Sequence, residues 1–137
     1  MSYTVDPTDA AYMPPSIASA VKGGTSTVDV SSYLNDAITA AGDGGKVIAP
    51  PGVYNFNDLV KLLQQMTFQG SGKGTKFVRM SSGVSIGNTE WADNSIYLGL
   101  GGGYIRDLAI SNGSTAQGDF GYVSYTFNDR IENVFLD

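Results

Sequence analysis

One stretch of the chain has the hydrophobic spacing of an amphipathic helix. From Ser31 to Ala41, apolar side chains fall at positions 33, 34, 37, 38 and 41, which form a single stripe at about 3.6 residues per turn. Asp29, Ser31 or Ser32 can cap its N-terminus, and Gly42 stands where a glycine commonly ends a helix. The pattern therefore predicts one helix over residues 31–41.

After Gly45 the pattern changes to short apolar segments separated by Gly, Asn, Asp and Ser. Several of these segments alternate apolar and polar residues with period two, as half-buried strands do. Pro50, Pro51 and Gly52 end the first of them. The predicted strands are 46–49, 53–56, 66–68, 76–80, 84–86, 95–98, 104–110, 122–125 and 130–136.

Two predicted strands share one pattern of residue types. Ile105–Ile110 and Ile131–Leu136 both read apolar, charged, Asp or Asn, apolar, any, apolar, and they lie 26 residues apart. Such spacing is typical of the stacked turns of a β-solenoid. Stacking would place Asp107 on Asn133 at a bend with a left-handed backbone, and Arg106 on Glu132. An Arg–Glu pair of this kind is more often structural than catalytic.

The first 27 residues have a different character. Pro7, Pro14, Pro15 and the pair Gly23–Gly24 interrupt any long helix or strand. The apolar residues Tyr12, Met13 and Ile17 can dock on a partner or on the body of the protein. We therefore expect an N-terminal arm or linker over 1–27 and one β-rich unit over 28–137.

Composition narrows the possible chemistry. The 137 residues include no cysteine and no histidine, which excludes disulfides, Ser-His-Asp triads and histidine-based zinc sites within this chain. There are 8 Lys+Arg against 13 Asp+Glu, and this net charge of −5 argues against nucleic-acid binding. No apolar run reaches the length of a membrane span. Glycine contributes 18 residues, and this high glycine content is typical of a fold with many tight turns.

Three motifs in order resemble the pectate lyase superfamily. Asp29–Ile38 is similar to its opening "D-T-x-x-I-Q-x-A-I", Gly44–Tyr54 to "G-G-x-V-x-x-P-P-G-x-Y", and Met66–Thr75 to "V-x-L-x-G-x-G-x-x-T". The motifs cover about a third of the chain. The resemblance implies an all-β fold, a right-handed single-stranded parallel β-helix, whose N-terminal end is closed by the helix at 31–41.

Within that superfamily the chain looks most like a bacteriophage tailspike or tail-fibre protein. Tyr12–Val21 is similar to a "Y-x-P-x-x-x-x-A-V" stretch that precedes such β-helices, although Val21–Gly24 replaces the usual "D-F-G-A-x-G-D-G". The resemblance implies a homotrimer of the virion tail, made in the host cytoplasm, that binds bacterial surface polysaccharide. Residues 1–27 would then contact other tail proteins. A secreted enzyme is the alternative.

Candidate sites follow from these expectations. Trp91 lies in the polar stretch 87–94, where it can stack on a sugar or pack on the body. The carbohydrate-binding candidates are Trp91, Asp93, Asp119, Tyr122 and Tyr125. The sequence indicates no metal site and no cofactor. The glycine-rich stretch 70–75 does not match a phosphate-binding loop, because Thr67 occupies the position of its first glycine.

Two functions remain open at this point. The first is the N-terminal portion of a receptor-binding tailspike, with about four turns of β-helix that we expect to continue past Asp137. The second is a polysaccharide hydrolase or lyase. Hydrolysis needs two carboxyl groups, and the available ones in the predicted turns are Asp93, Asp107, Asp119, Asp129 and Glu132. No sequence motif identifies a catalytic pair among them, so the catalytic residues are unassigned. The sequence also identifies neither the glycan nor the host.

Overall fold

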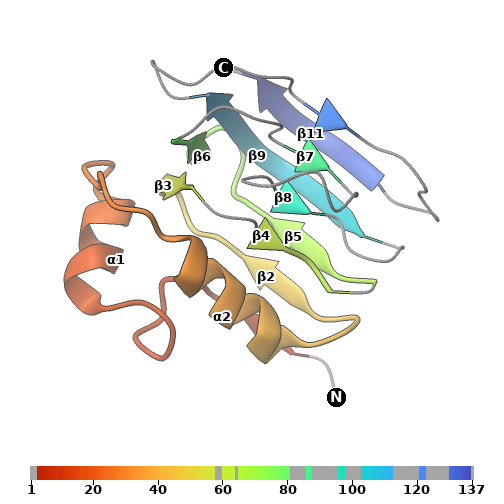
Figure 1. Ribbon diagram of the computed structural model, residues 1–137, viewed down its shortest axis with the longest axis horizontal. Coiled ribbons are helices and arrows are strands. Elements are labelled where there is room, and N and C mark those ends of the chain that lie inside the picture. The colour runs from red at the N-terminus through yellow and green to blue at the C-terminus, as the bar shows by residue number, and fades with distance from the viewer. Residues whose placement is uncertain are drawn as a thin grey trace.

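The computed structural model describes residues 3–57, 60–63, 65–80, 86–87, 96–97, 103–112, 121–122 and 130–136. This part of the chain is mostly β, with a parallel sheet and two helices (Figure 1). No helix within it is long and apolar enough to cross a bilayer.

The elements follow the sequence patterns closely. The predicted helix is confirmed as α2, with the bounds expected, and each predicted strand has a counterpart within a few residues. Helix α1 and strands β1 and β4 were not predicted. The elements are β1 Thr4–Val5, α1 Pro15–Lys22, α2 Ser31–Ala41, β2 Lys46–Ile48, β3 Gly52–Phe56, β4 Val60–Lys61, β5 Thr67–Gln69, β6 Thr75–Arg79, β7 Ile86–Gly87, β8 Ile96–Tyr97, β9 Tyr104–Asn112, β10 Gly121–Tyr122 and β11 Arg130–Leu136.

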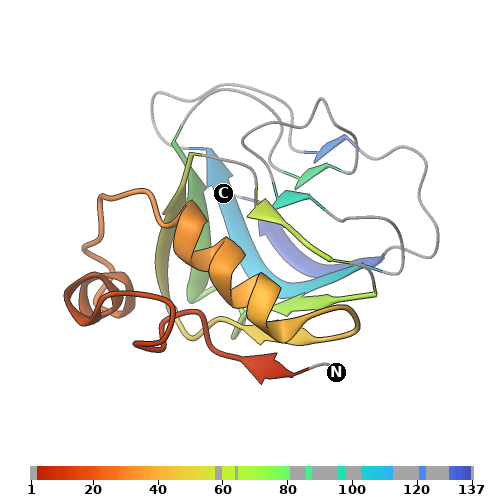
Figure 2. The same ribbon diagram turned by 60° about the horizontal axis from the view of Figure 1, so that its bottom comes forward.

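Every strand pairing is parallel among the described strands. The larger sheet has the order β1-β2-β5-β9-β6-β3, with β11 added beside β9. The first residues of β9 pair with β5 and its last residues pair with β6. The long strand β9 therefore joins the β2–β5 part of the sheet to the β3–β6 part. A smaller sheet has the order β10-β7-β8-β4. Figure 2 shows that β9 and β11 are strongly curved along their length.

The bend in β9 and β11 lies at the predicted position. Asp107 has φ 57° and Asn133 has φ 51°, so both have the left-handed backbone that Asp and Asn tolerate best after glycine. The pairing places Ile131 beside Ile105, Glu132 beside Arg106 and Val134 beside Leu108. The predicted alignment of the two similar segments is therefore confirmed.

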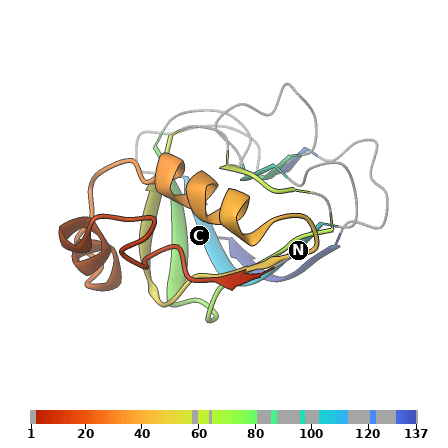
Figure 3. The ribbon, with the colours of Figure 1, turned by 90° about the horizontal axis from the view of Figure 1, so that it is seen from below.

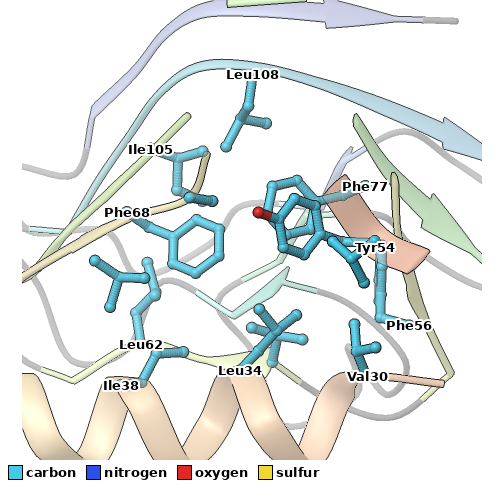
Figure 4. Packing of buried hydrophobic residues seen from close by; sticks show 14 of the residues in the cluster. Val30, Leu34, Ile38, Tyr54, Phe56, Leu62, Phe68, Phe77, Ile105 and Leu108 are labelled. Atoms are coloured by element: carbon cyan, nitrogen blue, oxygen red, sulfur yellow. The ribbon is translucent and has the colours of Figure 1, made fainter. Parts of the chain in front are cut away.

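The hydrophobic core lies between α2 and the two sheets (Figure 4). Tyr54 and Phe77 stack with ring centroids 4.8 Å apart, and Phe68 approaches Phe77 at 5.2 Å with tilted planes. Helix α2 contributes Leu34 and Ile38, both buried. Burial of aromatic and aliphatic surface on this scale is the main force that holds such a sheet stack together.

Helix α2 packs against the strands nearest the N-terminus. It contacts β1, β2 and β4, and Figure 3 shows it lying across the core on that side. Asp29 stabilises the start of the helix, because its Oδ1 accepts hydrogen bonds from the Ser31 N–H at 2.9 Å and the Ser31 hydroxyl at 2.5 Å. Gly42, with φ 75°, ends it.

Parts of the N-terminal segment pack on the body of the protein. Met13 and Val21 are fully buried in the core cluster, and Val5 pairs with Val47 of β2. Pro15 does not interrupt helix α1, because it lies in the first turn, where its missing N–H leaves no helical hydrogen bond unmade. Met13 was expected to dock either on a partner or on the body of the protein, and in the structure it is buried in the body.

Candidate functional site

A groove of about 590 Å³ runs along the bend in the larger sheet. It is formed where the turn after β5 approaches the middle of β9 and β11. Its lining combines amide, hydroxyl and carboxylate groups with one exposed aromatic ring. The lining residues are Ile48, Gln69, Gly70, Ser71, Gly72, Asp107, Asn133 and Phe135.

Two glycines allow the turn after β5 to lie directly on β9. The Gly70 N–H donates to the Arg106 carbonyl at 3.1 Å, and the Gly72 N–H donates to the Asp107 carbonyl at 2.7 Å. A Cβ at position 70 would lie 2.5 Å from the Asp107 carbonyl oxygen. Gly72 has φ 93°, a conformation that other residues rarely adopt. The floor of the groove therefore depends on residues without side chains.

Asp107 is the charged centre of the groove. Its Oδ1 accepts a hydrogen bond from Asn133 Nδ2 at 3.1 Å, and its Oδ2 lies 2.7 Å from Arg106 Nε. The hydrogen bond to this carboxylate raises the pKa of Arg106. The sequence predicted that Arg106 stacks on Glu132, and the strand register confirms it, but the ion pair of Arg106 is with its neighbour Asp107.

One wall of the groove is aromatic. Phe135 of β11 is 37% exposed, and Lys73 Nζ lies 4.8 Å from the centre of its ring. Lys73 belongs to the turn after β5, so this contact joins the two elements that flank the groove. An exposed ring beside polar groups offers a flat apolar surface to a ligand.

A second hollow of about 410 Å³ continues the groove toward β1. The two share Ile48 and Ser71, and the second is more apolar because the rings of Pro50 and Pro51 line it. Asp6 also lines it, and Asp6 Oδ1 accepts a hydrogen bond from the Thr8 hydroxyl at 2.7 Å. The combined surface is elongated and crosses the strands, which suits an extended ligand better than a small compact one.

Next to the groove, the outward face of β9 and β11 carries a cluster of charged groups around Tyr104. The guanidinium groups of Arg106 and Arg130 both lie 5.3 Å from the centre of the Tyr104 ring. The Tyr104 hydroxyl donates to Glu132 Oε2 at 2.8 Å, and this hydrogen bond raises the pKa of Tyr104. Arg130 Nη2 lies 4.0 Å from the same carboxylate oxygen.

These groups can bind a polar ligand through hydrogen bonds. Asp107 accepts, Asn133 and Gln69 both donate and accept, and the Ser71 hydroxyl does both. Within the described residues, no group of three or more Asp and Glu side chains could hold a metal ion. Among the described residues that line the groove, Asp107 alone can act as an acid or base.

The residues predicted from the sequence as carbohydrate-binding lie elsewhere in the chain. Trp91, Asp93, Asp119 and Tyr125 fall outside the described residues. Tyr122 belongs to β10 by its backbone. The groove was missed because its side chains come from segments distant in sequence. The repeated Asp107 and Asn133 position was its one sequence signal.

Comparisons of the chain with protein-family models, with curated proteins and with solved structures give no match.

Proposed function

We propose that this chain binds carbohydrate, and that its groove holds a stretch of bacterial surface polysaccharide. The observation that carries the proposal is the composition of the groove: the Asp107–Asn133 pair and Gln69 beside the exposed ring of Phe135. Sugars present hydroxyl groups on their edges and apolar C–H faces. Such ligands need closely spaced hydrogen-bonding groups and a flat apolar surface together.

The proposed fold is a right-handed single-stranded parallel β-helix closed by α2. It is supported by the parallel pairing of strands far apart in sequence and by the alignment of β9 with β11. The proposed biological role follows the resemblance to the pectate lyase superfamily. The chain would be the N-terminal portion of a phage tailspike or tail fibre, a homotrimer on the virion that attaches to the host.

A depolymerase is less well supported than a binding protein. Glycoside hydrolysis requires two carboxyl groups on either side of the scissile bond, about 5–9.5 Å apart. Within the part of the chain that the structure describes, Asp107 is the single carboxylate that lines the groove, and Arg106 and Asn133 already engage it. A carboxylate held in this way is suited to orient hydroxyl groups.

A panel of purified bacterial surface polysaccharides tests the proposal. The full chain should bind at least one of them, and Phe135→Leu should lower that affinity about three- to tenfold because it removes the ring but keeps an apolar side chain. Val28→Ala, a change at an exposed apolar residue that lines neither hollow, should leave binding unchanged. If no polysaccharide binds, or if both variants behave alike, the groove is not a glycan site.

The trimer is tested separately by analytical ultracentrifugation. The chain has a mass of 14.4 kDa, and the proposed assembly would sediment at about three times that mass. A species of 14.4 kDa over the whole concentration range would contradict the trimer and leave the glycan proposal to its own test.

A further inference from the structure

The outward face of the sheet beside the groove is basic, in a chain that is acidic overall. Two rows of side chains cross the strands there. The strand register aligns Lys46, Thr67, Tyr104 and Arg130 in one row, and Ile48, Gln69, Arg106 and Glu132 in the next. These rows contain three cations and one carboxylate, whereas the chain carries a net charge of −5.

Both arginines of this face lie against Tyr104, and Arg106 is also held by its ion pair with Asp107. Both guanidinium groups lie 5.3 Å from the centre of its ring, and cation–π contacts of this kind orient a side chain without neutralising its charge. The Arg130 side chain nevertheless remains 68% exposed, and its distance of 4.0 Å from Glu132 is too long for a hydrogen bond. Arg130 is thus oriented, charged and accessible.

From this arrangement we infer that the ligand of the groove is an anionic glycan, and that Tyr104, Arg106 and Arg130 bind its carboxylate or phosphate groups. The inference rests on the proposed glycan binding and adds the charge of the ligand to it. Arginine suits this role because its planar donors match the oxygens of carboxylate and phosphate. Arg106 connects the two surfaces, since it pairs with Asp107 inside the groove.

The overall charge distinguishes a glycan from a nucleic acid. A long polyphosphate would be repelled by the protein, because the whole chain carries a net charge of −5, and nucleic-acid affinity depends on many simultaneous phosphate contacts. Sparse anionic groups along a sugar chain require only the local cations of the two rows. A glycan with one charge every few sugars is therefore the ligand that this face fits.

Chemical modification of a bound polysaccharide tests the inference directly. Each polysaccharide of the panel that binds the full chain would be compared with its carboxyl-reduced form and with its dephosphorylated form. One of the two treatments should lower the affinity at least about threefold, and the treatment that does so identifies the anion. Raising the salt concentration should weaken the native complex and leave the complex with the treated glycan almost unchanged.

Two charge variants locate the effect. Arg130→Gln should reduce affinity for the native glycan about three- to tenfold and should not affect the treated glycan. Lys22→Gln removes the same charge from α1, away from both rows, and should change neither. Since Arg130 is exposed, circular dichroism of Arg130→Gln should match that of the unmodified chain.

The outcomes separate the inference from the function on which it rests. Glycan binding that neither treatment weakens, or that Arg130→Gln and Lys22→Gln affect equally, would overturn the anionic ligand and leave carbohydrate binding intact. Binding of DNA or RNA in place of any glycan would overturn both. If no polysaccharide binds at all, the proposed function fails and the inference fails with it.

Discussion

The side-chain amide of Asn133 donates a hydrogen bond to the carboxylate of Asp107 at 3.1 Å, and both residues occupy the left-handed region of the backbone. They occupy equivalent positions of neighbouring strands, at the bend of β11 and of β9. The same pair thus fixes the corner of the sheet and supplies the polar centre of the groove. The shape of the sheet and the proposed ligand binding therefore involve the same two side chains.

Asn133→Ala should lower the free energy of unfolding by about 1–2 kcal/mol. The change removes the hydrogen bond to Asp107 and places alanine at a positive φ, where its Cβ is strained. Asn133→Gly should lose less, because glycine adopts this backbone freely. Urea unfolding followed by circular dichroism measures both. Equal losses for the two variants would show that the left-handed backbone is not the source of the strain.

Gly70→Ala should destabilise the protein by about 2–4 kcal/mol. The new Cβ would lie 2.5 Å from the Asp107 carbonyl oxygen, 2.8 Å from Thr75 Cβ and 2.9 Å from Leu108 Cβ, so the turn would have to leave β9. Gly74→Ala is the matched control, because among the described residues its Cβ would contact Pro51 alone, at 3.6 Å. The unfolding midpoints should differ clearly between the two variants, and similar midpoints would refute the close approach at Gly70.

Asp29→Ala should cost about 1–2 kcal/mol of stability. Asp29 Oδ1 accepts from the Ser31 N–H and hydroxyl and from the Asn57 N–H at 3.1 Å, so its loss frees donors at the start of α2. Asp29→Asn keeps an acceptor oxygen and should retain part of this stability. Thermal unfolding of the three proteins tests the order. If the asparagine variant is no more stable than the alanine variant, the oxygen is not the important group.

The stability of the protein should fall above pH 10 because of Tyr54. Burial, and secondarily the charge of Asp6, raise the pKa of this phenol above its ordinary value of 10. Above pH 10 the unfolded chain therefore loses the Tyr54 proton while the folded chain keeps it, which favours unfolding by up to about 1.4 kcal/mol per pH unit. Below pH 10 both states stay protonated and no dependence arises from this group.

Tyr54→Phe isolates the contribution of Tyr54 from the other tyrosines. At pH 7 the variant should be about 1 kcal/mol less stable, because it lacks the hydrogen bond from the Tyr54 hydroxyl to the Pro50 carbonyl at 2.7 Å. The advantage of the unmodified chain should shrink as the pH rises through 10, measured by urea unfolding at several pH values. A difference that stays constant to pH 11 would contradict the raised pKa.

Much of the β-structure could be predicted because its signals are local. The apolar segments predicted the strands of the larger sheet except β1, and the shared pattern of 105–110 and 131–136 predicted both the alignment of β9 with β11 and the bends at Asp107 and Asn133. These features need only the chemistry of each residue and its immediate neighbours.

The parts that could not be predicted depend on contacts between distant segments. Helix α1 was missed because Pro15 reads as a helix breaker unless its place in the first turn is known. The pairing of Arg106 with Asp107, and not with Glu132, depends on side-chain rotamers that the strand register leaves open. The groove needs Gln69, Asp107 and Phe135 together, and no spacing in the sequence connects them.

The double pairing of β9 also bears on how the protein folds. Among the described strands of the larger sheet, no pair is joined by a tight turn, and even the pair β2 and β5 brings together Lys46 and Thr67. Contacts between residues this far apart in sequence form only after long loops have closed. The entropy of loop closure is therefore lost before the contacts stabilise the chain, which makes folding slow. Because β9 pairs with β5, β6 and β11, we expect its docking to be a late, concerted step and its release to be equally concerted. We expect a protein that folds sluggishly and, once folded, resists proteases through a slow rate of unfolding.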